Sequence, residues 1–275
     1  MNSALLPLVS IITPVYNGAR FLDALIQSVQ KQDYPYIEHI IIDDGSMDGE
    51  ATIDVLKKYS HLRWWTRPNR GQYATMNEGL QEALGEIVCF ISVDDVISPG
   101  AVSTAIDYLS VHPECGGVYG SYGFINSEGM KLNLFQPMRH MPTSLYPYSL
   151  HISHSSFYIH KKVLIQNDLF FIDTLRFVGD YFWIVRILKS KLEIGKIKNT
   201  LSMIRIHDQQ TSKTSFYAMR KEVFSVQKQI DISLFGASFF RKLWFFLNLI
   251  NATKLNGIKS AVTIVCERFR IRSGT

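Results

Sequence analysis

The sequence contains few cysteines and no long apolar run. Its three cysteines stand far apart in a chain of 275 residues, and no two of them form a C-x-x-C pair. They are Cys89, Cys115 and Cys266. This spacing argues against a disulfide framework and a zinc site, and it is typical of a reducing compartment. No stretch of about 18 residues is both apolar and uncharged, so a membrane-spanning helix is not expected.

Signals of several other protein classes are also missing. The first residues have neither the basic stretch nor the long apolar segment of a secretory signal, so we expect a cytoplasmic protein. No G-x-G-x-x-G follows an apolar run, which argues against a dinucleotide-dependent oxidoreductase. A sugar nucleotidyltransferase would need a glycine-rich phosphate loop after its first strand, where this chain has Thr13-Pro14-Val15-Tyr16-Asn17.

The positive charge is concentrated near the C-terminus. The formal net charge is +5, from 29 Lys and Arg against 24 Asp and Glu. Residues 236–275 hold seven basic residues and one acid, so this segment carries +6 and leaves −1 for residues 1–235. We therefore expect no nucleic-acid surface on the body of the protein and an anionic partner for the C-terminal segment.

Apolar runs alternate with stretches of helical periodicity, which predicts an α/β fold. We expect strands near residues 9–12, 39–42, 62–65, 86–92, 117–125, 155–160 and 194–206, and helices near 18–32, 48–59, 72–84, 99–110 and 179–189. Residues 126–152 contain three prolines and little periodicity, and we expect a long loop there that contacts the substrate.

Acidic residues follow two of the expected strands. Asp43-Asp44 and Asp94-Asp95 each come directly after an apolar run, and Asp180 begins an expected helix. Adjacent acids repel each other unless a positive charge lies between them, and Mg²⁺ or Mn²⁺ holding a diphosphate would supply it. A solvated acidic turn would explain one isolated pair. Two pairs at strand ends of one α/β series favour a shared ligand site at the carboxyl ends of the strands.

The segments around these acids resemble family 2 glycosyltransferases with the GT-A fold. The resemblance covers roughly residues 8–210 and consists of six motifs in the expected order. They are Val9-Ser10-Ile11-Ile12-Thr13-Pro14-Val15-Tyr16-Asn17, Ile41-Ile42-Asp43-Asp44-Gly45-Ser46, Asn69-Arg70-Gly71-Gln72, Ser92-Val93-Asp94-Asp95, Gly179-Asp180-Tyr181 and Arg205-Ile206-His207.

The resemblance implies a Rossmann-like mixed sheet flanked by helices. Residues 1–210 would form the GT-A catalytic domain. Its nucleotide-binding half would span about 1–112 and its acceptor half about 113–210. Residues 211–275 would form a C-terminal helical segment.

The resemblance also implies where the donor binds. Pro14 and Tyr16 would line the nucleobase pocket, and Asp44 would accept a hydrogen bond from the base. Uracil and thymine offer an N–H donor there, so we expect a uridine-type donor. Asp94 would contact the ribose. Gln72 and Asn77 are candidates for contact with the diphosphate or the sugar, and ordinary polar positions of a helix are the alternative for both.

The remaining roles concern the metal and the reaction. By resemblance, Asp95 would bind Mn²⁺ or Mg²⁺ beside the diphosphate, and His207 would reach the metal or the diphosphate. Asp180 would be the general base of an inverting transfer from a nucleotide-sugar to a saccharide acceptor, which we expect to be lipid-linked in polysaccharide or O-antigen-type biosynthesis. A plain helix cap is the alternative for Asp180, and a non-catalytic nucleotide- or sugar-binding module is the alternative for the chain.

The interpretation of two sequence features stays open. Many family members have Glu-Asp where this chain has Gly179-Asp180, although the acid that serves as the base is retained. His154 and its neighbours lie at the start of an expected strand; a structural histidine is the favoured interpretation, and a contact on the acceptor side is the alternative.

The C-terminal segment has an amphipathic pattern. Its aromatic and aliphatic residues between 239 and 250 fall on one side of a helix, and basic residues follow them. This pattern is typical of an interfacial helix at a membrane, which would suit a lipid-linked acceptor. Packing against the catalytic domain or against a partner in a homodimer is the alternative.

Overall fold

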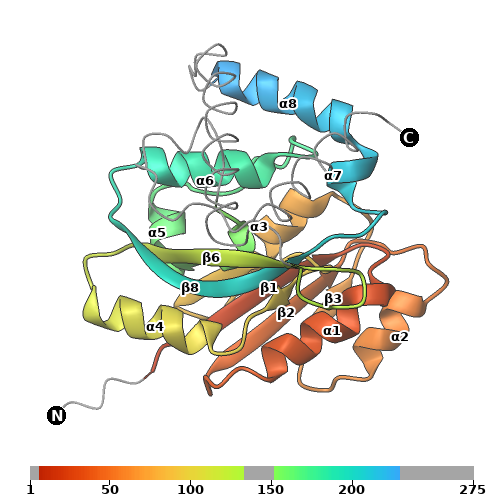
Figure 1. Ribbon diagram of the computed structural model, residues 1–275, viewed down its shortest axis with the longest axis horizontal. Coiled ribbons are helices and arrows are strands. Elements are labelled where there is room, and N and C mark those ends of the chain that lie inside the picture. Colours follow the sequence, from red (N-terminus) through yellow and green to blue (C-terminus); the bar gives the residue numbers. More distant parts are fainter. Residues whose placement is uncertain (1–5, 133–151, 230–275) are drawn as a thin grey trace, which may run out of the picture. The chain divides into compact units, whose positions relative to one another are not determined.

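The computed structural model describes residues 6–132 and 152–229 (Figure 1). The chain forms two compact units. The first comprises residues 1–122 and 152–204, and the second comprises residues 123–151 and 205–275. The predicted domain boundary at residue 210 remains a prediction.

The first unit begins with a parallel βα series. Strands β1 (Val9–Val15), β2 (Ile37–Asp43), β3 (Arg63–Thr66) and β4 (Ile87–Phe90) alternate with helices α1 (Ala19–Gln30), α2 (Ala51–Lys57) and α3 (Gln72–Glu82). Their order in the sheet is β3-β2-β1-β4, and neighbouring strands are parallel. The order reverses between β1 and β4, which is where open α/β sheets bind ligands at the carboxyl ends of their strands.

The rest of the sheet contains antiparallel pairs. The order continues with β7 (Phe157–His160), β6 (Gly117–Ile125), β8 (Ile194–Arg205) and β5 (Val96–Ile97). Strand β7 pairs with β4 so that Cys89 lies opposite Tyr158. The segment just before β7 therefore lies beside the segment just after β4. The segment before β7 is the 3₁₀ helix η2 (His154–Ser156).

Helices cover both faces of this sheet (Figure 1). Helices α1, α2 and α4 (Ala101–Val111) lie on one face, and α3 and α6 (Gly179–Lys189) lie on the other. Short helix α5 (Lys161–Gln166) follows β7. The first face buries aliphatic side chains, including Leu25, Val29, Val102, Ala105 and Ile106. The second contains an aromatic cluster of Phe90, Phe157, Phe171 and Trp183, whose closest rings, those of Phe171 and Trp183, lie 4.7 Å apart between centroids.

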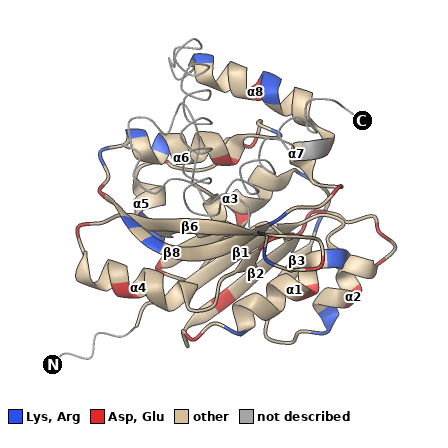
Figure 2. Ribbon diagram, viewed as in Figure 1, with Lys and Arg blue, Asp and Glu red and all other residues tan. Residues whose placement is uncertain are grey.

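The second unit contains a turn and two helices among its described residues. Ile125 pairs with Lys131 in an antiparallel bridge, and the Arg205 guanidinium donates to the carbonyl of Asn126 at 3.1 Å. Helices α7 (Thr211–Thr214) and α8 (Phe216–Gln229) follow. Lys and Arg are interspersed with Asp and Glu along the described chain (Figure 2).

A proline occupies β1, a strand with neighbours on both sides. The carbonyl of Ile12 accepts from Ile91, beside β4, and the carbonyl of Val15 accepts from Asp44, beside β2. Because backbone groups alternate along a strand, the nitrogen of Pro14 faces the side of β4. The ladder with β4 ends at Phe90, opposite Ile12, so no ladder hydrogen bond is lost at Pro14.

The structure confirms the predicted fold class and corrects some boundaries. The predicted strand to Ser92 ends at Phe90, because the chain turns and the Asp95 N–H donates to the Ser92 carbonyl at 3.1 Å. Ser155 and Ser156 are 3₁₀-helical rather than extended. Strand β5 and helix α5 are not anticipated by the sequence patterns, since both are too short to show a period.

Two predicted segments fall largely or wholly outside the described residues. They are most of the loop at 126–152 and the amphipathic segment at 236–275. Within residues 6–132 and 152–229, no helix combines the length and the apolar character needed to cross a membrane.

Close packing of α3 on the sheet yields a prediction about stability. A Cβ atom on Gly79 would lie 2.4 Å from Cγ2 of Ile12, a side chain that is fully buried. We expect Gly79→Ala to destabilise the protein by about 1–3 kcal/mol through overpacking, although alanine favours helix formation. Thermal unfolding should show a drop of several degrees, with Gln81→Ala on the exposed side of α3 as the control. An unchanged melting temperature for Gly79→Ala would contradict this packing.

Candidate active site

Asp43, the last residue of β2, shapes the loop that follows it. Its carboxylate is buried and accepts a hydrogen bond from the Thr66 hydroxyl at 2.6 Å. It also accepts from the backbone N–H and the hydroxyl of Ser46. These contacts close the turn at Gly45, whose φ of +75° favours glycine. Asp43 is therefore accounted for by the local fold.

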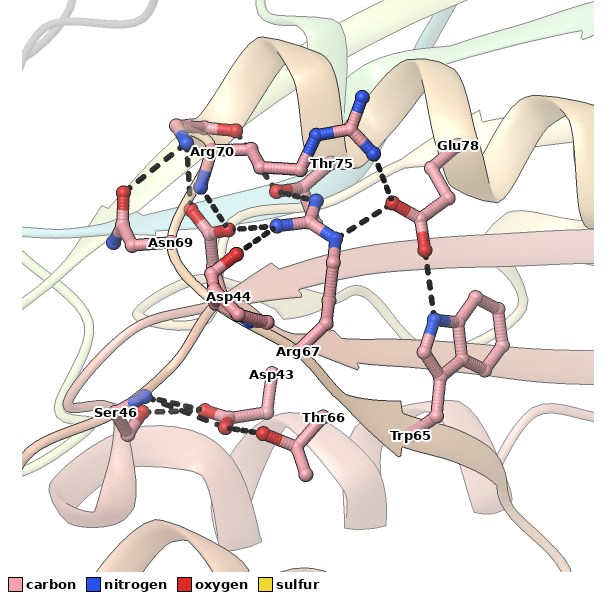
Figure 3. Close-up of polar contacts among 12 residues, drawn as sticks. Asp43, Asp44, Ser46, Trp65, Thr66, Arg67, Asn69, Arg70, Thr75 and Glu78 are labelled. Atoms are coloured by element: carbon pink, nitrogen blue, oxygen red, sulfur yellow. Dashed lines mark hydrogen bonds and ion pairs between the residues drawn. The ribbon is translucent and has the colours of Figure 1, made fainter.

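Asp44 is held by the segment that leads into α3 (Figure 3). Its Oδ1 atom accepts from the Arg67 guanidinium and from the Arg70 N–H at 2.8 Å, and its Oδ2 atom accepts from the Gly71 N–H at 2.9 Å. A carboxylate oxygen can accept about two hydrogen bonds, so Oδ2 retains acceptor capacity. The charge of Asp44 is neutralised within the protein, and the carboxylate is fixed in one orientation.

Arg67 joins this carboxylate to α3. Its Nε atom donates to Glu78 at 2.6 Å and its Nη2 atom donates to Thr75 at 2.9 Å (Figure 3). Glu78 also accepts from the indole of Trp65 at 2.8 Å. Burial raises the pKa of Glu78, but the hydrogen bonds from Trp65 and Arg67 outweigh it and hold that pKa below its usual value. The result is a connected network of ionised groups, in which each hydrogen bond is charge-assisted.

The loop after β1 is tied to the loop after β2. Asn17 adopts a left-handed backbone conformation with φ of 51°, and its Oδ1 atom accepts from the Met47 N–H at 2.7 Å. Its own N–H donates to the Ser46 hydroxyl at 2.8 Å. Tyr16, just before it, is 42% exposed, whereas Pro14 is buried in β1.

Asp94 and Asp95 lie in the turn after β4. Asp95 is buried and its Oδ2 atom accepts from the Ser155 hydroxyl at 3.0 Å, while Asp94 is half-buried. One or two carboxylates completed by phosphate oxygens suit Mg²⁺ or Mn²⁺. Among the residues that the structure describes, no three His, Cys, Asp or Glu side chains gather as a complete metal-binding set.

Asp180, in the first turn of α6, has contacts on both carboxylate oxygens. Oδ1 accepts from the Tyr73 hydroxyl at 3.2 Å and from the Tyr181 N–H at 2.8 Å. Oδ2 lies 3.4 Å from Nδ1 of His154. Burial raises the pKa of Asp180, but the hydrogen bond and charge of His154 outweigh it, and the pKa is lowered. The side chain is 32% exposed, so an ionised carboxylate remains accessible.

His154 connects Asp180 to the turn after β4. It is buried, and its Nε2 atom lies 3.2 Å from the Ser92 hydroxyl. Burial lowers the pKa of His154, but the hydrogen bond and charge of Asp180, with the charges of Asp95 and Asp94, outweigh it and raise the pKa. Sequence reasoning favoured a structural role for this histidine. The antiparallel pairing of β7 with β4, which no sequence motif reveals, places it among the acids.

Three other candidates have different surroundings. Gln72 is exposed at the start of α3. Asn77 uses both amide atoms on the backbone of Phe171, at 2.9 Å each, so packing accounts for this residue and a donor-binding role stays a prediction. His207 follows β8 in the second unit, and its metal-binding role also stays a prediction.

Comparison with known proteins identifies the family. Residues 10–177, more than half of the chain, match the protein family described as Glycosyl transferase family 2. The chain belongs to this family. It spans from 23% to 67% of the lengths of the first curated relatives it matches.

One relative and two solved structures illustrate the resemblance. TuaG of Bacillus subtilis, named as a teichuronic acid biosynthesis glycosyltransferase, is 31% identical over 144 residues, which is 50% of this chain and 55% of TuaG. A structure of Staphylococcus aureus TarS with UDP-GlcNAc covers 90% of this chain and 76% of the other, at 19% identity and a TM-score of 0.64. The mannosyltransferase PcManGT of Pyrobaculum calidifontis, with GDP-Man and Mn²⁺, covers 96% and 80%, at 16% identity and a TM-score of 0.60. These likenesses establish the GT-A fold.

The structure explains why this family 2 chain has glycine before the acid of α6. A Cβ atom on Gly179 would lie 2.6 Å from Cδ2 of the Tyr73 ring. That ring is buried and stacks on Phe171, with 5.8 Å between ring centroids. The Tyr73 ring thus leaves no room for the Cβ atom of a glutamate at position 179. The hydroxyl of the same tyrosine donates a hydrogen bond to Asp180.

The close approach of Gly179 and Tyr73 can be tested by a double-mutant cycle. We expect Gly179→Ala to lower the melting temperature by several degrees, because the ring cannot retreat from its stack on Phe171. Tyr73→Ala alone also destabilises, by about 3–5 kcal/mol for a large buried ring. In the double variant the methyl group enters the vacated space, so the combined loss should be smaller than the sum. Strict additivity would show that the two residues do not compete for space.

Proposed function

We propose that the chain is a metal-dependent, inverting glycosyltransferase. It moves a sugar from a UDP-sugar to a hydroxyl group of a saccharide acceptor. The observation that carries the proposal is the state of Asp180, whose carboxylate is ionised, partly exposed and held on both oxygens. A helix cap does not require a phenol and an imidazole to orient it.

The donor side is supported by Asp44 and its surroundings. The remaining acceptor capacity of Oδ2 suits an N–H of uracil, and Pro14 and exposed Tyr16 lie in and after the neighbouring strand. Asp94 is our candidate for the ribose contact. TarS, whose structure with UDP-GlcNAc has the same fold, supports a UDP-sugar as donor.

Asp95 is our candidate for holding the divalent cation, with Asp94 beside it. The acidic turn after β4 fits a hard cation whose other ligands are phosphate oxygens and water. PcManGT, solved with Mn²⁺, supports this choice. When bound, the cation stabilises negative charge on the departing diphosphate.

Asp180 performs the proton transfer of the reaction. The acceptor hydroxyl attacks the anomeric carbon from the face opposite the leaving group. Its O–H bond breaks and the proton passes to the Asp180 carboxylate, while the bond between the anomeric carbon and the diphosphate oxygen breaks with its electron pair on that oxygen. Burial raises the pKa of Asp180, but His154, with the hydrogen bonds from the Tyr181 N–H and the Tyr73 hydroxyl, outweighs this effect and favours the ionised carboxylate until the acceptor arrives.

The acceptor is inferred from the relatives. TuaG is named for teichuronic acid biosynthesis and TarS as a poly(ribitol-phosphate) β-N-acetylglucosaminyltransferase, which supports an acceptor that belongs to a surface polymer. A lipid-linked saccharide would bring the basic residues 236–275 to an anionic membrane surface, with a homodimer interface as the alternative role of that segment.

Donor binding is the first prediction of this function. UDP with Mn²⁺ at about 100 times its dissociation constant should stabilise the protein by about 2.7 kcal/mol, a shift of several degrees. We expect smaller shifts with GDP and CDP. Asp95→Ala should remove the dependence on Mn²⁺, whereas Asp54→Ala, an exposed acid on α2, should retain it. No shift with any nucleotide would refute the assignment of the donor site.

Turnover separates the enzyme from a non-catalytic binding module. We expect Asp180→Asn to lower kcat by at least about a hundredfold, since general-base catalysis is lost, and to leave the dissociation constant for UDP unchanged. The measurement is sugar transfer from radiolabelled UDP-sugars to lipid-linked saccharides, with calorimetry of UDP binding. A wild-type protein that binds UDP with Mn²⁺ and transfers no sugar to any acceptor would favour the binding module.

A further inference from the structure

His154 takes no proton in the proposed reaction, yet this buried residue contacts both Asp180 and Ser92. Its Nδ1 atom faces Oδ2 of Asp180 at 3.4 Å, and its Nε2 atom faces the hydroxyl of Ser92 at 3.2 Å. Ser92 precedes the turn that carries Asp94 and Asp95. The imidazole thus bridges the start of α6 and the end of β4.

Local structure fixes this bridge. His154 opens the 3₁₀ helix η2, and the Ser153 hydroxyl before it accepts a hydrogen bond from the Ser155 N–H at 3.2 Å. The Ser155 hydroxyl in turn donates to Asp95 at 3.0 Å. Two successive residues therefore contact the two functional acids, His154 at Asp180 and Ser155 at Asp95. A shift of η2 would move both contacts together.

The contacts of Asp180 leave one hydrogen-bond acceptor position on its carboxylate for a substrate hydroxyl. Oδ1 already accepts from the Tyr73 hydroxyl and the Tyr181 N–H, which fills its two acceptor positions. Oδ2 accepts from His154 and keeps one position. The position that remains on Oδ2 is therefore where an acceptor hydroxyl can bind, and the direction in which it points is set by the imidazole.

We propose that His154 is a positioning residue that orients the Asp180 carboxylate toward the acceptor hydroxyl and ties that orientation to the Ser92–Asp95 turn. This inference rests on the proposed function, since it assigns Asp180 as the base. Small errors in placing a reacting group are costly, with about a hundredfold loss for a displacement of about 1 Å. His154 acts through Asp180 and does not itself take the proton of the acceptor.

Two isosteric substitutions separate the two contacts of the imidazole. The amide nitrogen of asparagine can occupy the place of Nδ1, and that of glutamine can occupy the place of Nε2. His154→Asn therefore keeps a donor toward Asp180 and loses the contact with Ser92, whereas His154→Gln does the reverse. We expect His154→Gln to lower kcat about 10- to 100-fold and His154→Asn to lower it less than about tenfold. Both should bind UDP with Mn²⁺ as the wild type does.

The dependence of kcat on pH provides a further test, because replacing a histidine with a purely structural role would leave it unchanged. The groups that face His154 are Asp180, Asp95, Asp94 and the Ser92 hydroxyl. A cationic imidazole lowers the pKa of Asp180, so the neutral amide of His154→Asn should let that pKa rise. Since the base must be ionised, the acidic limb of kcat against pH should then move to higher pH. His160→Asn, a half-buried histidine six residues further on, is the control and should leave the limb in place.

The outcomes distinguish this inference from the proposed function. If the wild type transfers sugar and His154→Gln matches His154→Asn in kcat, or if the acidic limb does not move, His154 is structural and the inference is wrong. If His154→Gln fails to fold, the kcat of Ser92→Ala and the acidic limb of the pH profile of His154→Asn provide the test. A larger loss of kcat in Ser92→Ala than in His154→Asn, or an unmoved limb, would overturn the inference. A wild type without sugar transfer would overturn both proposals.

Discussion

Compensation of negative charge at the carboxyl ends of the strands is the constraint on which the site depends. Asp44 after β2 and Asp95 after β4 are both buried, and an unpaired buried carboxylate is costly. A different basic side chain lies beside each of these two acids or their neighbours. Arg67 pairs with Asp44 and Glu78, and the imidazole of His154 lies among Asp180, Asp95 and Asp94. Groups of the protein therefore hold these carboxylates in place before any ligand arrives.

Helix α3 connects these two charge clusters. Thr75 and Glu78, three residues apart on one face, hold Arg67, while Tyr73 and Asn77, four residues apart on another, contact Asp180 and Phe171. The packing of α3 on the sheet is close, because Gly79 lies directly on Ile12. A rotation of α3 would disturb the surroundings of Asp44 and Asp180 together, so its close packing on β1 is part of the geometry of the site.

Much of this arrangement could be predicted from the sequence. Apolar runs and the acids that follow them indicate strand ends, and strand ends of a parallel sheet meet at one edge, so the positions of Asp44 after β2 and Asp95 after β4 could be predicted, while their roles stay predictions. The partners of these acids could not. Arg67 reaches Asp44 because β2 and β3 pair with Asp43 opposite Thr66, and register is a property of the assembled sheet. Asn77, a polar residue near a glycine turn, holds the backbone of Phe171, a contact that no sequence pattern reveals, and its donor-binding role stays a prediction.

Arg67 and His154 differ in a way that matches their surroundings. Arginine stays charged at every physiological pH, and its planar guanidinium can bind Asp44, Glu78 and Thr75 at once, which suits a rigid frame around the proposed nucleobase site. Histidine can lose its proton, and its two ring nitrogens point in opposite directions. At Asp180 an arginine would hold the carboxylate so firmly in its ionised form that it would be a poor proton acceptor. An imidazole contacts the same carboxylate with a smaller and adjustable charge, so orientation and basicity can coexist at the proposed base.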